Sequence, residues 1–171
     1  KVTPANGADM SIKFTFSKPG TYYLDNVRIV EDSLIKNGDF SAGLSSFEPF
    51  ADGSANASWV VDSITEDNAI DFTINNTGDA AWKVQLKQNN VELINGQWYK
   101  LSFDAKSSVD RKLMYAIQRD GSKHNDDWTP YSGEKIVDLG ADYQNYSVEF
   151  QMTEPTDSES VLSISMGAVG G

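Results

Sequence analysis

The sequence predicts an all-β protein, an antiparallel β-sandwich of the jelly-roll kind. Three observations lead to this expectation. Apolar residues alternate with polar ones along much of the chain, which is the period of a strand with one buried face. Clusters of turn-forming residues separate the alternating runs. No window of about eleven residues or more places apolar side chains at the spacing of an amphipathic helix. Many short strands joined by turns are typical of sandwiches and jelly rolls.

The expected strands follow in chain order, and each is bounded by turn chemistry. The alternating runs lie at residues 12–16, 82–86, 101–105, 113–117, 146–150 and 162–166. Residues rich in Gly, Asn, Asp, Ser and Pro lie between them at 17–20, 37–39, 75–79, 94–96, 119–121 and 154–157. Such residues favour turns because they adopt left-handed backbone or hydrogen-bond to nearby main chain.

Size and charge exclude several classes of function. The 171 residues suffice for one ordinary domain, and the formal net charge is −11, from 14 Lys and Arg against 25 Asp and Glu. A strongly acidic protein is repelled by phosphate backbones and anionic lipid surfaces, so we expect neither nucleic-acid nor membrane binding. No apolar run approaches the roughly 18 residues of a membrane span. The chain has no cysteine, which rules out disulfides and thiolate metal sites.

An internal similarity divides the chain. Residues 11–17 and 161–167 alternate in the same way, and each is followed within a few residues by glycine. Chance similarity between two amphipathic strands is one explanation. The other is that residues 1–32 end one module and residues 33–171 form most of the next. Lys1 begins no signal peptide, so we expect a fragment of a longer, exported precursor.

Three sequence boxes carry a resemblance to a known family. Residues 34–40 (Leu-Ile-Lys-Asn-Gly-Asp-Phe) with a following Gly-x-x-x-Phe segment form the first box, and 96–107, from Gly-Gln-Trp-Tyr to Ala-Lys-Ser, form the second. Residues 22–27 (Tyr-Tyr-Leu-Asp-Asn-Val) form the third. Together they resemble bacterial carbohydrate-binding modules of families 4, 16 and 22. The resemblance implies a β-sandwich with a glycan cleft on one concave sheet.

The chain departs from that family pattern in two ways. Phe47 stands where the family usually has Trp, and the box that normally closes the domain precedes the one that opens it. In such sandwiches the first and last strands resemble antiparallel neighbours, so a short turn at 31–33 could join them. Residues 1–32 would then supply the closing strands of a circularly permuted module, giving one structural domain. Alternatively they are the tail of a preceding repeat.

Catalysis has little support in the sequence. The only histidine is His124, in a polar loop, and no Gly-x-Ser-x-Gly elbow accompanies it. A glycoside hydrolase or lyase needs only two suitably spaced carboxylates, so this alternative stays open. Most of the acids fall in turns or at strand peripheries, as a solvated surface would place them. We therefore expect a module that is not an enzyme.

Sugar recognition requires flat aromatic rings for the faces of the sugar and amides or hydroxyls for its edges. Alternation assigns each strand residue to one of the two sheet faces. The polar side chains expected on the concave outer face are Gln85, Asn89, Gln118, Ser163 and Ser165.

Aromatic side chains complete the expected site. The resemblance places cleft aromatics at Phe50 and in the loop that contains Trp128, and a tryptophan in so polar a loop is not expected in a core. In the alternating pattern Trp82 falls on the same face as the core residues of its strand. From a strand end it could still reach the edge of the cleft, so we include it among the expected ligand-binding residues. Trp59 and Trp98 are expected to be structural, and Phe47 to fill the family's core tryptophan position.

The resemblance also implies a structural calcium ion. Asp25 and Asp39 lie in the two boxes where relatives hold it, and calcium prefers six to eight oxygen ligands. Alternatively, Asp39 caps its Asn-Gly-Asp turn and Asp25 binds nearby backbone.

These inferences define the expected function. The protein should bind single chains of a neutral β-linked plant polysaccharide, with β-1,4-glucan (cellulose) or β-mannan favoured over xylan. It would be a secreted, monomeric bacterial module that directs a covalently attached glycoside hydrolase to its substrate. A calcium-stabilised structural or adhesion β-sandwich is the alternative from another class.

Overall fold

The computed structural model describes residues 33–62 and 69–170. The description below concerns the unit Ser33–Gly171. The strand expected at 12–16, the closing segment expected at 1–32 and Asp25 lie outside the described residues.

The regular secondary structure of the described residues consists of β-strands and two short 3₁₀ turns. In order the elements are β1 (Glu48–Ala51), β2 (Asn56–Asp62), β3 (Ala69–Asn76), η1 (Ala81–Lys83), β4 (Val84–Leu93), β5 (Trp98–Ala105), β6 (Arg111–Gln118), η2 (Gly121–Lys123), β7 (Lys135–Leu139), β8 (Gln144–Gln151) and β9 (Asp157–Ser165). Within the described residues, no helix is long and apolar enough to cross a membrane.

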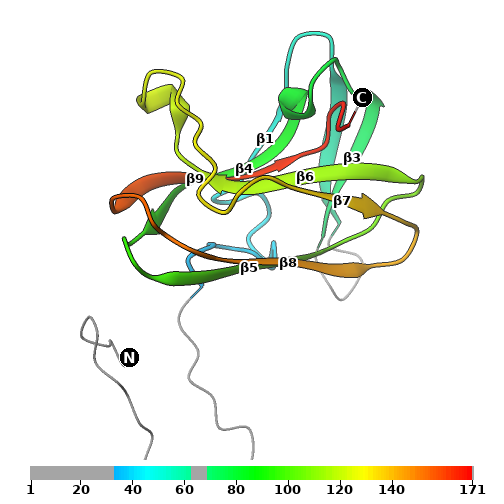
Figure 1. Ribbon diagram of the computed structural model, residues 1–171. Coiled ribbons are helices and arrows are strands. Elements are labelled where there is room, and N and C mark those ends of the chain that lie inside the picture. Colours follow the sequence, from blue (N-terminus) through cyan, green and yellow to red (C-terminus); the bar gives the residue numbers. More distant parts are fainter. Residues whose placement is uncertain (1–32, 63–68, 171) are drawn as a thin grey trace, which may run out of the picture. The chain divides into compact units, whose positions relative to one another are not determined.

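The strands form two main layers. A five-stranded antiparallel sheet has the order β1-β4-β9-β6-β7, and β5 pairs with β8 in a second layer (Figure 1). Strands β2 and β3 form an antiparallel pair of their own. The prediction of an antiparallel β-sandwich is confirmed.

The core lies between the five-stranded sheet and the β5–β8 pair. Alternate residues of β4, β6 and β9 point into it, and Leu86, Leu113 and Leu162 are each less than 5% exposed. The opposing layer contributes Leu101 and Phe150. Burying apolar side chains of this size stabilises a fold by roughly 1.5–3 kcal/mol each.

Two features of the strands differ from the sequence expectation. Residues 82 and 83 belong to η1, so strand parity does not apply to Trp82. Trp98 was expected in the core, and this prediction is wrong, because its side chain is 67% exposed. Tyr99 and Leu101 on β5 point inward, so alternation turns Trp98 to the outer surface of the second layer. Phe47 is buried at 8% exposure, as expected.

Candidate functional site

The outer face of the five-stranded sheet holds most of the residues expected to bind a ligand. Strand register places them in rows that cross the strands. In the first row Phe50 of β1 lies opposite Gln85 of β4, and Gln85 lies opposite Ser165 of β9. In the row nearest the β6–β7 loop, Gln118 lies opposite Val161.

Gln85 is held over the two serines of β9. Its Nε2 donates to Ser163 Oγ at 2.9 Å and to Ser165 Oγ at 3.0 Å. Ser163 is 3% exposed and Ser165 is 1% exposed, so their hydroxyls lie beneath the Gln85 amide. The serines were expected to contact a ligand directly, whereas the structure gives them the role of fixing Gln85. Both amide hydrogens of Gln85 are used, and its Oε1 remains as an acceptor.

Phe50 and Gln118 are half-buried on this same face. The Lys87 ammonium lies 5.3 Å from the centre of the Phe50 ring, a cation–π distance. Ala116, opposite Ser163, is only 3% exposed, so the middle of the face carries small side chains. Longer side chains on β4 and β6, such as Gln85 and Gln118, flank this strip.

The loop between β6 and β7 carries Trp128. Figure 1 shows this loop, coloured yellow, rising from the side of the five-stranded sheet that faces away from β5 and β8. Trp128 is 43% exposed. Its indole packs directly on Gly121, where a methyl group would come within 2.5 Å of the ring atoms Cδ2 and Nε1. One side of the ring is therefore fixed by packing while part of it stays open to solvent.

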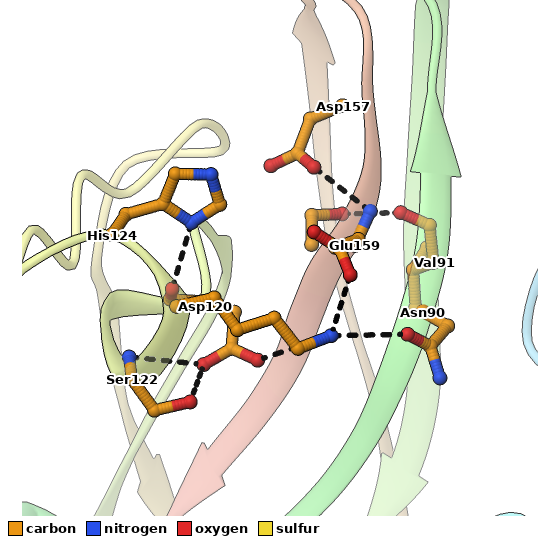
Figure 2. A network of polar contacts seen from close by, with 9 residues as sticks. Asn90, Val91, Asp120, Ser122, His124, Asp157 and Glu159 are labelled. Atoms are coloured by element: carbon orange, nitrogen blue, oxygen red, sulfur yellow. Dashed lines mark hydrogen bonds and ion pairs between the residues drawn. The ribbon is translucent and has the colours of Figure 1, made fainter.

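A polar network fixes the turn under the tryptophan (Figure 2). Asp120 accepts hydrogen bonds from the backbone N–H of Ser122 at 3.1 Å and from its hydroxyl at 2.5 Å, which caps η2. Lys123 forms an ion pair with Glu159 of β9 at 2.9 Å and donates to Asn90 of β4 at 3.5 Å. The loop is thereby tied to two strands of the sheet.

A second ion pair closes the loop on itself. Arg119 binds the Asp127 carboxylate and donates from Nε to the Tyr131 hydroxyl at 3.0 Å. Thr129 donates to Asp127 from its hydroxyl and its backbone N–H, and these bonds, with Arg119, lower the pKa of Asp127. The residues on either side of Trp128 are thus both held.

The remaining aromatic candidate lies at the other end of β4. Trp82 in η1 is 47% exposed, and the Lys83 ammonium lies 4.2 Å from its ring centre. Lys83 is in turn paired with Asp52 at 2.7 Å. β4 and β6 both run antiparallel to β9, so they run the same way and the β6–β7 loop lies at the far end from η1. Trp82 and Trp128 therefore stand at opposite ends of the sheet.

The expected calcium site is only partly described. Asp39 Oδ1 accepts from the backbone N–H and the hydroxyl of Ser41, which lowers the pKa of Asp39 and matches the alternative of a turn cap. Nowhere in 33–62 and 69–170 do three or more His, Cys, Asp or Glu side chains gather as metal ligands. Asp25, the other expected ligand, lies outside the described residues, so the calcium site stays a prediction.

His124 does not take part in a nucleophile–base arrangement within the described structure. Its Nδ1 lies 2.9 Å from the carbonyl oxygen of Asp120, which fixes the ring against the loop (Figure 2).

Three supporting residues were not identified from sequence. Gly121, Lys123 and Arg119 hold Trp128, yet none of them belongs to the classes expected to touch a sugar. The Asp-Gly-Ser sequence at 120–122 could have suggested a capped turn, because Asp accepts hydrogen bonds from the following backbone. The partners of Lys123 and Arg119 lie across the fold or along an irregular loop, and sequence spacing does not reveal them.

The comparisons with known proteins place this domain among carbohydrate-recognition domains. The family model described as "Carbohydrate binding domain" matches residues 32–170. The chain belongs to this family, whose domains bind carbohydrate and are non-catalytic. Among curated proteins, none matches the sequence.

Solved structures share the architecture. A CBM4 structure superposes with a TM-score of 0.65 at 24% identity, covering 78% of this chain and 88% of that one. The apo form of BiXyn10A CBM1 gives a TM-score of 0.52 at 12% identity, with 70% and 84% covered. The enzymatically active domain of bacteriophage CBA120 tailspike protein 4 gives 0.55 at 12% identity, covering 81% of this chain but 20% of that protein. At these identities the likeness concerns the fold.

Proposed function

We propose that the outer face of the five-stranded sheet binds a single chain of a neutral β-linked polysaccharide, with β-1,4-glucan or β-mannan as the favoured ligands. The observation that carries the proposal is Trp128, which is fixed on Gly121 and still 43% exposed. A rigid, half-open indole offers a flat apolar surface for the C–H face of a pyranose ring at little entropic cost.

The polar groups of the same face suit sugar hydroxyls. Gln85 presents an acceptor that the buried serines hold in place, and Gln118 adds a second amide at the Trp128 end of the sheet. Amides both donate and accept, as hydroxyls do. Neutral ligands are favoured because the net charge of −11 repels polyanions such as polyuronates.

In the full-length protein the domain would direct an attached glycoside hydrolase to its substrate in the extracellular space. Tethering raises the effective concentration of substrate at the catalytic domain without new chemistry. A calcium ion held by Asp39 and Asp25 would serve stability. We expect calcium to raise the melting temperature of the full chain and EDTA to reverse the effect.

The first experiment is calorimetric titration with cellohexaose, mannohexaose, xylohexaose and laminarihexaose, using wild type and Trp128→Ala. We expect the variant to lose about thirtyfold or more in affinity, since truncating an aromatic anchor commonly costs on the order of 2 kcal/mol. Its circular dichroism and melting temperature should stay close to those of wild type, because the ring is already half-exposed.

Trp98→Ala is the matched control. It removes a tryptophan that is 67% exposed on the opposite layer, so it should leave affinity unchanged. Equal losses in both variants, or no binding of any glycan by wild type, would contradict the proposed site. In the second case the structural or adhesion function would gain support.

A further inference from the structure

A polar cavity lies beside the proposed binding face, where β1 begins and β4 departs from regular pairing. Its volume is about 370 Å³. Phe47 and Gln88, which are almost fully buried, line it. The other lining residues are polar or charged: Lys36, Ser46, Glu48, Asn89 and Asn90.

The wall formed by Gln88 is rigid. The Gln88 side chain is 2% exposed, its Oε1 accepts from the Lys36 backbone N–H at 2.7 Å, and its Nε2 donates to the Lys36 carbonyl at 2.8 Å. This pair of bonds ties β4 to the segment that leads into β1. The cavity is therefore already formed, and a ligand would not have to order its walls.

A β-bulge shapes the other side. The pairing of β4 with β9 shifts between Gln88 and Val91, and Asn90 adopts a left-handed backbone with φ of 57°. Bulges of this kind change the direction of side chains at sheet edges and binding sites. The bulge is held in place by the buried Ser160, whose hydroxyl donates to the Val91 carbonyl, and by Lys123, which donates to Asn90.

The polar groups at the rim have unused hydrogen-bonding capacity. Within the described part of the chain, the amide of Asn89 and the carboxylate of Glu48 have no hydrogen-bond or ion-pair partner. Glu48 shares the outer face with Phe50, two residues further along β1. Asn89 lies four residues beyond Gln85, roughly 13 Å along the strand. The cavity thus continues the proposed binding face past its edge.

We propose that this cavity binds one neutral hexose unit through its vicinal hydroxyls. A carboxylate such as Glu48 can accept from two neighbouring hydroxyls at once, and Asn89 can donate and accept. Glu48 and Lys36 both line the cavity, so their opposite charges balance and suit a neutral sugar. The inference rests on the proposed polysaccharide function and adds a second contact to it. The hexose unit is either the end of the bound chain or a branch carried by it.

The test combines calorimetry with nuclear magnetic resonance on the full chain. The ligands are linear mannohexaose and cellohexaose, the same backbones carrying a single α-linked galactose branch, and methyl β-D-glucoside as an isolated hexose. The variants are Glu48→Gln and Asn89→Ala. Asn145→Ala, which truncates an exposed amide on β8 in the other layer, is the matched control.

We expect each cavity variant to lose about tenfold in affinity, the equivalent of roughly 1.4 kcal/mol, and the control to lose nothing. The side-chain amide signal of Asn89 should shift on titration. Losses confined to the branched ligands identify a branch as the occupant, and equal losses with linear ligands identify a chain end.

Three outcomes separate this proposal from the preceding one. If hexasaccharides bind through Trp128 while Asn89 does not shift and the cavity variants match wild type, the cavity proposal is overturned and the proposed function stands. If ligands shift Asn89 and Trp128→Ala has no effect, the cavity proposal stands and the outer-face site fails. If no glycan perturbs either region, both are overturned.

Discussion

A single glycine determines where the exposed tryptophan of the β6–β7 loop lies. The indole of Trp128 packs on the backbone of Gly121, and no other residue would leave room for it there. The glycine is required because of this close approach, since its φ is not in the left-handed region. The Trp128 side chain, which we expect to touch the sugar, is thus positioned by a residue that has no side chain.

Gly121→Ala should therefore weaken glycan binding without unfolding the domain. The new methyl group would come within 2.5 Å of two indole atoms, so the ring must move from its position. We expect an affinity loss approaching that of Trp128→Ala, measured by calorimetry, with a melting temperature changed by only a few degrees.

Gly140→Ala is the control for this substitution. A methyl group at Gly140 meets no atom within 4 Å, so this variant should bind as wild type does. If Gly121→Ala binds as tightly as Gly140→Ala, the position of the ring is not important for recognition.

At the scale of elements, the β6–β7 loop depends on charged side chains, and this gives it a defined pH range. The pKa of Asp127 is lowered by hydrogen bonds from Thr129 and by Arg119. The contribution of Asp127 to stability is therefore complete above its ordinary pKa of 3.8 and is lost as the pH falls through the lowered value. The pKa of Lys123 is raised by its bond to Glu159, so that contact persists into alkaline solution.

We expect glycan affinity to be constant from about pH 5 to pH 8 and to fall only below pH 3.8, as the pH drops through the lowered pKa of Asp127. Calorimetry across this range tests the expectation. Asp127→Asn should reduce affinity at neutral pH and make the affinity less dependent on pH in acidic solution. A wild-type affinity that falls between pH 7 and pH 5 would show that another group controls the loop.

The elements also show which parts of the structure could be predicted from sequence. Strands β5, β6, β8 and β9 follow apolar alternation, because a sheet with one buried face imposes that period. The same alternation places Trp98 outside once Tyr99 and Leu101 are taken as core, so that signal was present in the sequence. The bulge at Asn90 and the 3₁₀ turn at Trp82 were not predictable, because both depend on neighbouring strands far away in sequence.

The candidate site was predictable in its residue types and less so in their roles. Parity placed Gln85, Ser163 and Ser165 on one face, and the register confirms that they are neighbours. Strand alternation could not show that Gln85 covers the serines, because this depends on the length of the side chain and on which hydrogen bonds form between β4 and β9. The metal prediction involving Asp25 and Asp39 stays a prediction.

At the scale of the whole molecule, the net charge of −11 distinguishes neutral from charged ligands. Binding of an uncharged glycan releases no counterions, so its affinity should change by less than about twofold between 0.05 M and 0.5 M sodium chloride. Calorimetry in the two buffers measures this. A strong gain in affinity for an acidic polysaccharide at high salt would instead show that screened repulsion, and not the chemistry of the face, limits what is bound.

The placement of exposed tryptophans on both layers also determines what an optical titration can report. Trp128 and Trp98 emit from opposite sides of the sandwich, and both are open to solvent. A saccharide lying on the five-stranded sheet would shield the first from a collisional quencher such as acrylamide and leave the second accessible. Intrinsic emission would thus remain partly quenchable even with every molecule occupied, and incomplete protection would not mean incomplete binding.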